Sequence, residues 1–274
     1  MTWLAYVLGD IAVFCALMLL VWKAELRLRW ALPWALIICP GCLWLAHQLS
    51  LHIPGFSFGL QVLAGLFLSL AASAFAVLLL FFRDPARTIP RDPRAILSPA
   101  DGKILYINCV ADDEFPVAVK KGKHIPLREF TGETLQLTHG LQVGIMMSYL
   151  DVHVNRAPIG GTLERVKRIH GGFHSLKHMD SLLENERIFS IIRGPDIRVE
   201  IVQIASRVVR RIVPFVKEGD IVCQGDRIGV IRFGSQVDVL IPNGQGVSVL
   251  VERGDYVKAG LSVLARLNVP NDTV

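Results

Sequence analysis

The sequence predicts two parts: a membrane region of three transmembrane α-helices in residues 1–82, and a mainly-β domain of β-sandwich type in residues 83–274. Three observations support this division. The chain of 274 residues is 52% hydrophobic with a mean hydropathy of +0.44, which is too apolar for one soluble domain. The apolar excess is concentrated before residue 83. After it, short alternating runs separated by Gly, Pro and Asp are typical of antiparallel strands.

Three apolar segments of the first part are long enough to cross a bilayer as helices: 4–22, 31–49 and 56–82. Pro33 and Pro40 interrupt the second, so a re-entrant segment is its alternative. Basic residues lie between the first two segments and after the third, and none lies between the second and third. The positive-inside rule therefore predicts an outside N-terminus and a C-terminal domain that faces the cytoplasm at the cell inner (plasma) membrane.

The overall charge and the cysteines exclude several classes of partner. A net charge of +5 is too small and dispersed to indicate nucleic acid, but it suits an anionic membrane surface. The five cysteines form no pattern with His or further Cys that is typical of a zinc site or a disulfide framework. A reducing compartment is expected for the globular part.

The β-domain begins with an extended segment, because prolines at 85, 90 and 93 prevent the third helix from continuing. One helix is expected within 175–185. Strand-like runs are expected at 134–137, 143–147, 163–169, 188–192, 197–205 and 208–213.

Two more strands are predicted to meet at Gly234-Ser235, where alternating apolar residues lie on both sides. A Gly-Ser step is poor packing material inside a strand. It is usually a β-bulge or tight bend. The alternative is that the neighbouring hydroxyl must approach the backbone of Gly234 closely. This stretch alone leaves the two readings open.

An internal repeat follows the pattern V-x-x-G-D-x-V-x-x-G at 216–225 and at 251–260. The doubling resembles the lipoyl-like half-barrel repeats of biotinyl and lipoyl carrier domains, which predicts a barrel-sandwich hybrid. A carrier presents a Lys between its two halves, and residues 232–254 contain none. The repeat therefore predicts the architecture without the carrier function.

Two polar clusters stand out in the β-domain, around Asp101 in SPADGKI and around His153 in DVHVNRAP. Taken alone, Asp101 is an ordinary Asx-turn residue and His153 a hydrogen-bonded turn residue. They belong, however, to a series of five motifs along the chain: FFRDP at 81–85, SPADGKI at 98–104, DVHVNRAP at 151–158, ENER at 184–187 and FGSQVDV at 233–239. In these motifs and in their order, the chain resembles the phosphatidylserine decarboxylase family in its short, membrane-anchored branch.

The resemblance implies a carboxy-lyase of phospholipid biosynthesis that is made as a zymogen and converts phosphatidylserine to phosphatidylethanolamine. In this family the serine corresponding to Ser235 attacks the carbonyl of the residue corresponding to Gly234. Autocatalytic cleavage then leaves a pyruvoyl group, the covalent cofactor, in place of Ser235. The resemblance assigns Asp101 and His153 to the assisting base, and His153 also to proton donation during turnover.

The chain departs from the better-known long branch at two positions. That branch carries two histidines spaced HxxH, whereas this chain has His153 followed by Arg156. Two assignments of the base are therefore open: His153 serves both self-cleavage and turnover, or Asp101 acts with a different partner. Gln236 also replaces a threonine whose hydroxyl could have assisted.

Substrate binding is expected from Arg156, Asn155, His174 and Arg83, with Arg83 and Arg87 meeting lipid phosphates. His174 belongs to a row of three histidines whose spacing would align them on one face of a helix, as in a metal site. A Gly-Gly pair at 171–172 argues against a helix there. No metal is therefore expected, and the histidines are assigned to the rim of a head-group pocket. The expected partners are the phospholipid and the membrane, with the two self-cleaved chains associated; a homodimer is left open, and so is the lipid tail.

The main alternative is a non-enzymatic, membrane-anchored adaptor with a half-barrel domain. It predicts an intact chain with no special need for Asp101, His153 or Ser235. A catalytically silent relative with a binding role is a second alternative. The state of the bond before Ser235 separates all three.

Overall fold

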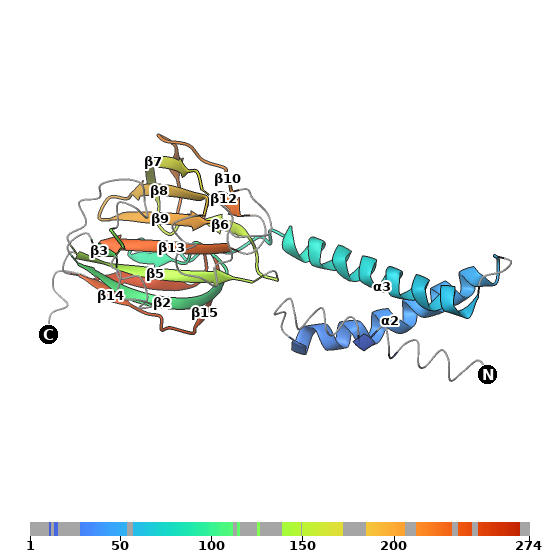
Figure 1. The fold of residues 1–274 in the computed structure, drawn as a ribbon. Coiled ribbons are helices and arrows are strands. Elements are labelled where there is room, and N and C mark those ends of the chain that lie inside the picture. The colour runs from blue at the N-terminus through green and yellow to red at the C-terminus, as the bar shows by residue number, and fades with distance from the viewer. Residues whose placement is uncertain are drawn as a thin grey trace. The chain divides into compact units, whose positions relative to one another are not determined.

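The computed structural model describes residues 11, 14–15, 28–53, 57–111, 114–115, 125–126, 139–148, 150–171, 185–205, 212–231, 235–242 and 246–268. The chain divides into two compact units, Met1–Phe81 and Phe82–Val274. The first is helical and the second is built from antiparallel strands (Figure 1).

The helical unit contains α2 (Leu28–Ser50) and α3 (Phe58–Phe81). α2 runs on through both of its prolines, so the expected interruption is not seen. The two helices pack on each other: a side chain at Gly65 of α3 would place its Cβ 2.8 Å from the Cγ of Leu43 in α2. Small residues at such contacts allow helices to approach closely where lipid surrounds them.

Within the described part of the chain, one helical stretch is long and apolar enough to cross a membrane, Gly59–Phe81 of α3. The apolar stretch of α2, Pro33–Leu49, is shorter. The expected first span, 4–22, lies outside the described residues except for 11, 14 and 15. An N-terminal apolar helix that suggests membrane anchoring is therefore present, while three crossings stay a prediction.

The strands of the second unit include most of those expected. Of the sequence-predicted runs, 143–147, 163–169, 188–192 and 197–205 fall on strands, whereas 134–137, 208–211 and the helix at 175–184 lie outside the described residues. The strands are β1 (Ala95–Leu97), β2 (Gly102–Ala111), β3 (Glu114–Phe115), β4 (Ile125–Pro126), β5 (His139–Met147), β6 (Val154–Arg156), β7 (Gly161–Ile169), β8 (Arg187–Arg193), β9 (Arg198–Ile204), β10 (Ile212–Pro214), β11 (Ile221–Val222), β12 (Arg227–Ile231), β13 (Ser235–Pro242), β14 (Val247–Val249), β15 (Tyr256–Val257) and β16 (Val263–Leu267).

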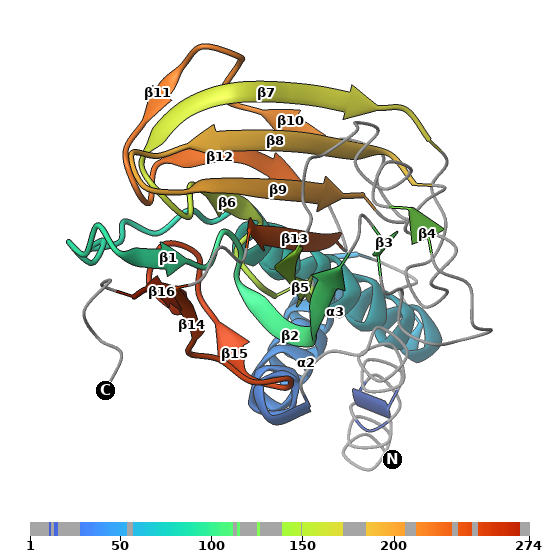
Figure 2. The same ribbon diagram turned by 90° about the vertical axis from the view of Figure 1, so that its left-hand side faces the viewer.

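These strands form one large curled sheet and two small ones. The large sheet has the order β11-β7-β8-β9-β13-β5-β2-β3-β4, with β15 also paired to β2, and its strands bend strongly in Figure 2. The small sheets are β1-β16-β14 and β10-β12-β6. β13 lies inside the large sheet, paired with β5 on one side and β9 on the other.

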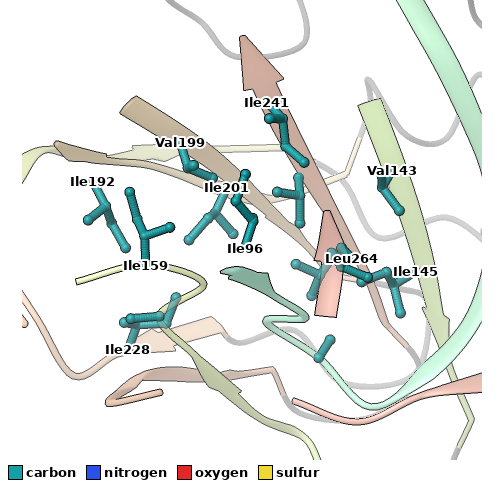
Figure 3. Close-up of a cluster of buried hydrophobic side chains, with 14 of the residues drawn as sticks. Ile96, Val143, Ile145, Ile159, Ile192, Val199, Ile201, Ile228, Ile241 and Leu264 are labelled. Atoms are coloured by element: carbon teal, nitrogen blue, oxygen red, sulfur yellow. The ribbon is translucent and has the colours of Figure 1, made fainter. Parts of the chain in front are cut away.

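The main core lies on one face of the large sheet, and the inner strands β8, β9 and β13 are buried on the opposite face as well. Val237, Val239 and Ile241 of β13 are fully buried, as expected from the alternation in the sequence. Figure 3 shows Ile96 of β1 and Leu264 of β16 pointing into the same cluster, so a small sheet covers this face.

The internal repeat forms two equivalent loops, residues 216–225 and 251–260, each with a short strand, β11 or β15, between two turns. Its glycines have positive φ at matching positions: Gly219 (+89°) matches Gly254 (+105°), and Gly225 (+84°) matches Gly260 (+70°). Only glycine adopts this left-handed region without strain. The sequence pattern therefore marks backbone geometry rather than a modification site.

The two loops also dock on matching strands. The N–H of Leu163 in β7 donates to the carbonyl of Asp220 at 2.8 Å, and the N–H of Ile104 in β2 donates to the carbonyl of Asp255 at the same distance. The repeat thus extends to β7 and β2, the strands to which the two loops are bonded. Residues 101–104 of one half correspond to residues 160–163 of the other.

Candidate functional site

Ser235 lies where the chain passes from one sheet to another. β12 ends at Ile231 in a small sheet, and β13 begins at Ser235 in the large sheet, where the backbone of Ser235 pairs with Met147 of β5. Gly234 lies outside the described residues. Two strands do flank the Gly-Ser step as the sequence predicts, but they belong to different sheets.

His153 is held beside the end of β12 that leads to Gly234. Its carbonyl accepts a hydrogen bond from the N–H of Ile231 at 3.2 Å. The following residues form β6, which pairs with β12. A buried histidine, 1% exposed, is therefore tied by backbone bonds to the strand that ends three residues before Gly234.

The environment of His153 keeps its ring neutral. Nδ1 lies 2.9 Å from the carbonyl oxygen of Asp151, which can only accept, so Nδ1 carries the proton and Nε2 is the basic nitrogen. Burial lowers the pKa of His153 to about 4, while the carbonyl and charge of Asp151 act in the opposite direction. The charge of Arg83 also lowers this pKa, and that of Asp101 raises it. Both charged groups are therefore within electrostatic reach of the imidazole.

The carboxylate of Asp101 reaches out of its own turn. Its two oxygens accept hydrogen bonds from Nη1 and Nη2 of Arg87 at 2.6 and 2.8 Å. A third bond comes from the backbone N–H of Ala259 at 2.7 Å. Arg87 is itself buried, with a side chain only 5% exposed. The expectation that Arg87 meets lipid phosphate is therefore wrong, because its guanidinium is occupied by an internal carboxylate.

Asn155 and Arg156 both have protein partners. Asn155 is fully buried; its Oδ1 accepts from Gln203 at 2.7 Å, and its Nδ2 lies 3.9 Å from the sulfur of Met147, the residue paired with Ser235. Arg156 donates to Asp84 at 3.1 Å and to the carbonyl of Gly225 at 3.0 Å. Burial lowers the pKa of Arg156, and the charge of Asp84 opposes that shift.

The other two expected head-group residues are placed differently. Nη2 of Arg83 donates to the carbonyl of Leu150 at 2.6 Å, so this side chain lies beside the segment that leads to His153. His174 lies outside the described residues, while His170 is exposed at the end of β7. No cluster of three or more His, Cys, Asp or Glu that could hold a metal ion occurs among the residues described.

A buried polar network beside Ser235 was not foreseen from the sequence. The carboxylate of Asp238 accepts from Gln236 at 2.7 Å, from Tyr106 at 2.7 Å and from Gln142. Burial raises the pKa of Asp238 to about 6, and the three donors counteract this. Tyr106 reaches across β5 over Gly144, since a side chain at Gly144 would overlap the phenol ring. An acid in the middle of an apolar strand and a glycine in a neighbouring one are the signals that could have revealed it.

The chain is similar to proteins of one known family. The family model described as phosphatidylserine decarboxylase matches residues 74–265. The chain is 41% identical to the phosphatidylserine decarboxylase proenzyme of Novosphingobium aromaticivorans over 235 residues, which cover 80% of this chain and 87% of that protein. It is 38% identical over 198 residues to the putative archaetidylserine decarboxylase proenzyme of Methanothermobacter thermautotrophicus, covering 72% of this chain and 83% of that one. On this evidence, the chain belongs to the phosphatidylserine decarboxylase family.

Proposed function

We propose that the chain is a proenzyme that cuts itself between Gly234 and Ser235 and then decarboxylates phosphatidylserine to phosphatidylethanolamine. Family membership supports the reaction. The observation that supports the position of the site is the backbone bond between Ile231 and His153, because it ties a buried, neutral imidazole to the strand that leads into Gly234. A non-enzymatic adaptor gives no reason for that arrangement.

The cleavage needs a base, because a serine hydroxyl is a weak nucleophile at its own pKa. In this proposal Nε2 of His153 takes the proton while the oxygen of Ser235 attacks the carbonyl carbon of Gly234. The peptide C–N bond breaks as the ester forms. Elimination releases the carboxylate of Gly234 and leaves a dehydroalanine at 235. Water then converts that residue to a pyruvoyl group and releases ammonia.

The residues around position 235 suit a new chain end that carries a ketone. The backbone ladder of β13 starts at Ser235, so the cut falls at the edge of this strand and leaves residues 236–242 paired with β5. Asn155 and Met147 line the position on the side of β5 and β6. When formed, the pyruvoyl group supplies an electron sink for the electrons released with the carboxylate of the substrate. We assign to His153 the return of a proton to the product carbon.

Head-group recognition in this proposal uses the shared phospho-serine part of the lipid. Arg83 and His174 are assigned to the phosphate and its surroundings, and a guanidinium suits an anionic phosphate. Asn155 and Arg156 contribute through the buried contacts that hold β6 in place. The related proteins include both a phosphatidylserine and a putative archaetidylserine decarboxylase proenzyme, so the lipid core is a separate question from the head group.

The domain is assigned to the cytoplasmic side of the membrane. The support is the distribution of basic residues around the apolar segments of the first 82 residues. Protease added to inside-out vesicles should digest the domain, whereas right-side-out vesicles should protect it. The reverse result would contradict this orientation.

A denaturing gel with mass spectrometry tests the function. The purified protein should run as fragments of residues 1–234 and 235–274, and the small fragment should begin with a pyruvoyl group instead of serine. Ser235→Ala should give one intact band without decarboxylase activity. An intact wild-type chain with an ordinary serine at 235 would rule out the proposal.

A further inference from the structure

The bidentate ion pair between Arg87 and Asp101 has no role in the reaction described so far. We infer that Arg87 is a positioning residue, which fixes the carboxylate of Asp101 beside His153 for self-cleavage. The inference rests on the proposed function of Ser235 and His153. Two parallel hydrogen bonds set both the position and the plane of a carboxylate, which one bond does not.

The internal repeat indicates that the fold itself does not require this carboxylate. Position 101 corresponds to Gly160 in the other half, where the same turn and the same docking bonds form without a side chain. Asp101 accepts from the N–H of Ala259; the matching atom in the other half, the N–H of Gln224, would lie 3.3 Å from a Cβ at Gly160. The carboxylate and its guanidinium are thus additions to one half alone. The turn that carries the carboxylate also docks on the segment after His153, where the N–H of Arg156 donates to the carbonyl of Pro99 at 2.9 Å.

The segment that carries Arg87 is fixed at several points. We call residues 83–89 the strap. Asp84 is bonded by Arg156 and Arg227, and Ile89 lies against Gly225, where a Cβ would come 2.5 Å from its side chain. The backbone on both sides of Arg87 is therefore anchored by contacts that do not involve Asp101, which reduces the entropy lost in forming the ion pair.

Both fragments of the cut chain contribute to this arrangement. Arg87 also donates to the carbonyl of Ala259 at 2.6 Å, so Arg87, Asp101 and Ala259 form a closed set of three bonds. Ala259 and Ser235 lie in the same fragment, 235–274. Arg87 thus ties the carboxylate of Asp101 to the fragment that bears the nucleophile.

The carboxylate matters because the base becomes a cation. When His153 takes the proton of Ser235, a correctly placed negative charge nearby stabilises the imidazolium, and Asp101 already acts on His153 in this sense by raising its pKa against burial. A carboxylate that rotates away stabilises it less. Arg87 acts on His153 only through Asp101, so the loss of Arg87 should matter little to cleavage once the carboxylate of Asp101 is absent.

The test compares rates of self-cleavage in full-length chains made by cell-free synthesis into lipid nanodiscs. Arg87→Gln should slow cleavage about 10- to 100-fold, by analogy with the loss when a hydrogen-bond partner that orients a metal-ligating side chain is removed. Arg87→Lys, which keeps the charge but not the fork, should be intermediate. Arg266→Gln is the matched control, because it removes an exposed ion pair to Asp92, beyond the strap, and should cleave at the wild-type rate.

A double-mutant cycle separates positioning from a structural role. In an Asp101→Asn background, where cleavage is followed by mass spectrometry over days, Arg87→Gln should have little further effect. An equally large slowing in that background would overturn the inference. If Asp101→Asn gives no product, or if Arg87→Gln does not accumulate, the cleavage rate of Arg87→Lys is compared with that of the wild type instead. Slower cleavage at an unchanged melting temperature supports the inference, and a wild-type rate overturns it. If the wild type itself is not cut, the proposed function fails instead.

Discussion

At the scale of single residues, burial decides what His153 and Asp238 can do. Burial disfavours the charged form of each, so the pKa of the imidazole falls to about 4 and that of the carboxyl rises to about 6. One result is a neutral base beside the end of β12. The other is an acid held by three donors: Gln236 of the same strand, Gln142 of β5 and Tyr106 of β2.

The lowered pKa of His153 predicts how self-cleavage depends on pH. A neutral ring is required to accept the proton, and this ring stays neutral down to about pH 4. We expect the cleavage rate of a freshly made precursor to be nearly constant from about pH 8 to about pH 5 and to fall near pH 4. The measurement is the fraction of cut chain against time in a series of buffers. A midpoint near 6.5, the value for a solvated histidine, would show that the base is not this buried ring.

The same shift affects stability. Because the folded-state pKa of His153 is lower than its unfolded value, the unfolded chain binds the proton more readily between about pH 6.5 and pH 4. The contribution of His153 to the free energy of unfolding therefore decreases as the pH falls through this range. Cleavage rates at low pH must be compared on protein that is still folded, checked by its melting temperature.

At the scale of elements, the two loops of the repeat have the same backbone geometry but different surroundings. Gly219 and Gly225 have nearly equal φ, yet a Cβ at Gly219 meets nothing within 4 Å, whereas one at Gly225 would overlap Ile89 of the strap. The first glycine is needed for its conformation alone. The second is needed also because the strap packs directly on it.

This difference predicts two unequal losses of stability. Gly219→Ala should lower the free energy of unfolding by about 1–2 kcal/mol, the cost of a left-handed alanine. Gly225→Ala should lose about 1–3 kcal/mol more from overpacking. Urea unfolding can be followed by circular dichroism in an uncut Ser235→Ala background. Tryptophan fluorescence is unsuitable, since all five tryptophans precede residue 83.

Ile89→Ala provides the control for this pair. It should cost less in the Gly225→Ala background than in the parent, because it removes the overlap. It should cost the same in the Gly219→Ala background as in the parent. Equal losses for the two glycine variants would mean that the strap does not pack on Gly225 in solution.

At the scale of the whole molecule, the place of β13 in the large sheet determines what happens after the chain is cut. β13 is bonded to β5 and β9, and both of these strands belong to residues 1–234. Its apolar side chains lie in the main core, and Asp238 is bonded by Tyr106 of β2. The small fragment is therefore an integral part of the fold.

We expect the two fragments to stay together after self-cleavage. In mild detergent, an affinity tag at the C-terminus should retain the large fragment in equal amount, and only a denaturant should separate the two. The measurement is the composition of the eluate on a denaturing gel, with the uncut Ser235→Ala chain as the control for recovery. Release of the small fragment by mild detergent alone would contradict the central position of β13.

The sequence by itself determined the features that local pattern encodes. An apolar run predicts α3, alternation predicts β5, β7, β8 and β9, and spaced glycines predict the repeated loops. Each of these patterns reports burial or backbone geometry within a few residues. The residue types at 101, 153 and 235 likewise pointed to chemistry through the motifs that contain them.

Only the tertiary structure decided which groups meet. Arg87 pairs with Asp101 and not with lipid phosphate, Tyr106 reaches Asp238 across Gly144, and the Gly-Ser step joins two different sheets. These contacts depend on strand order and register between segments up to 172 residues apart, as for Arg87 and Ala259. No local periodicity carries that information, because a period describes which face of a strand is buried and not which strand lies beside it.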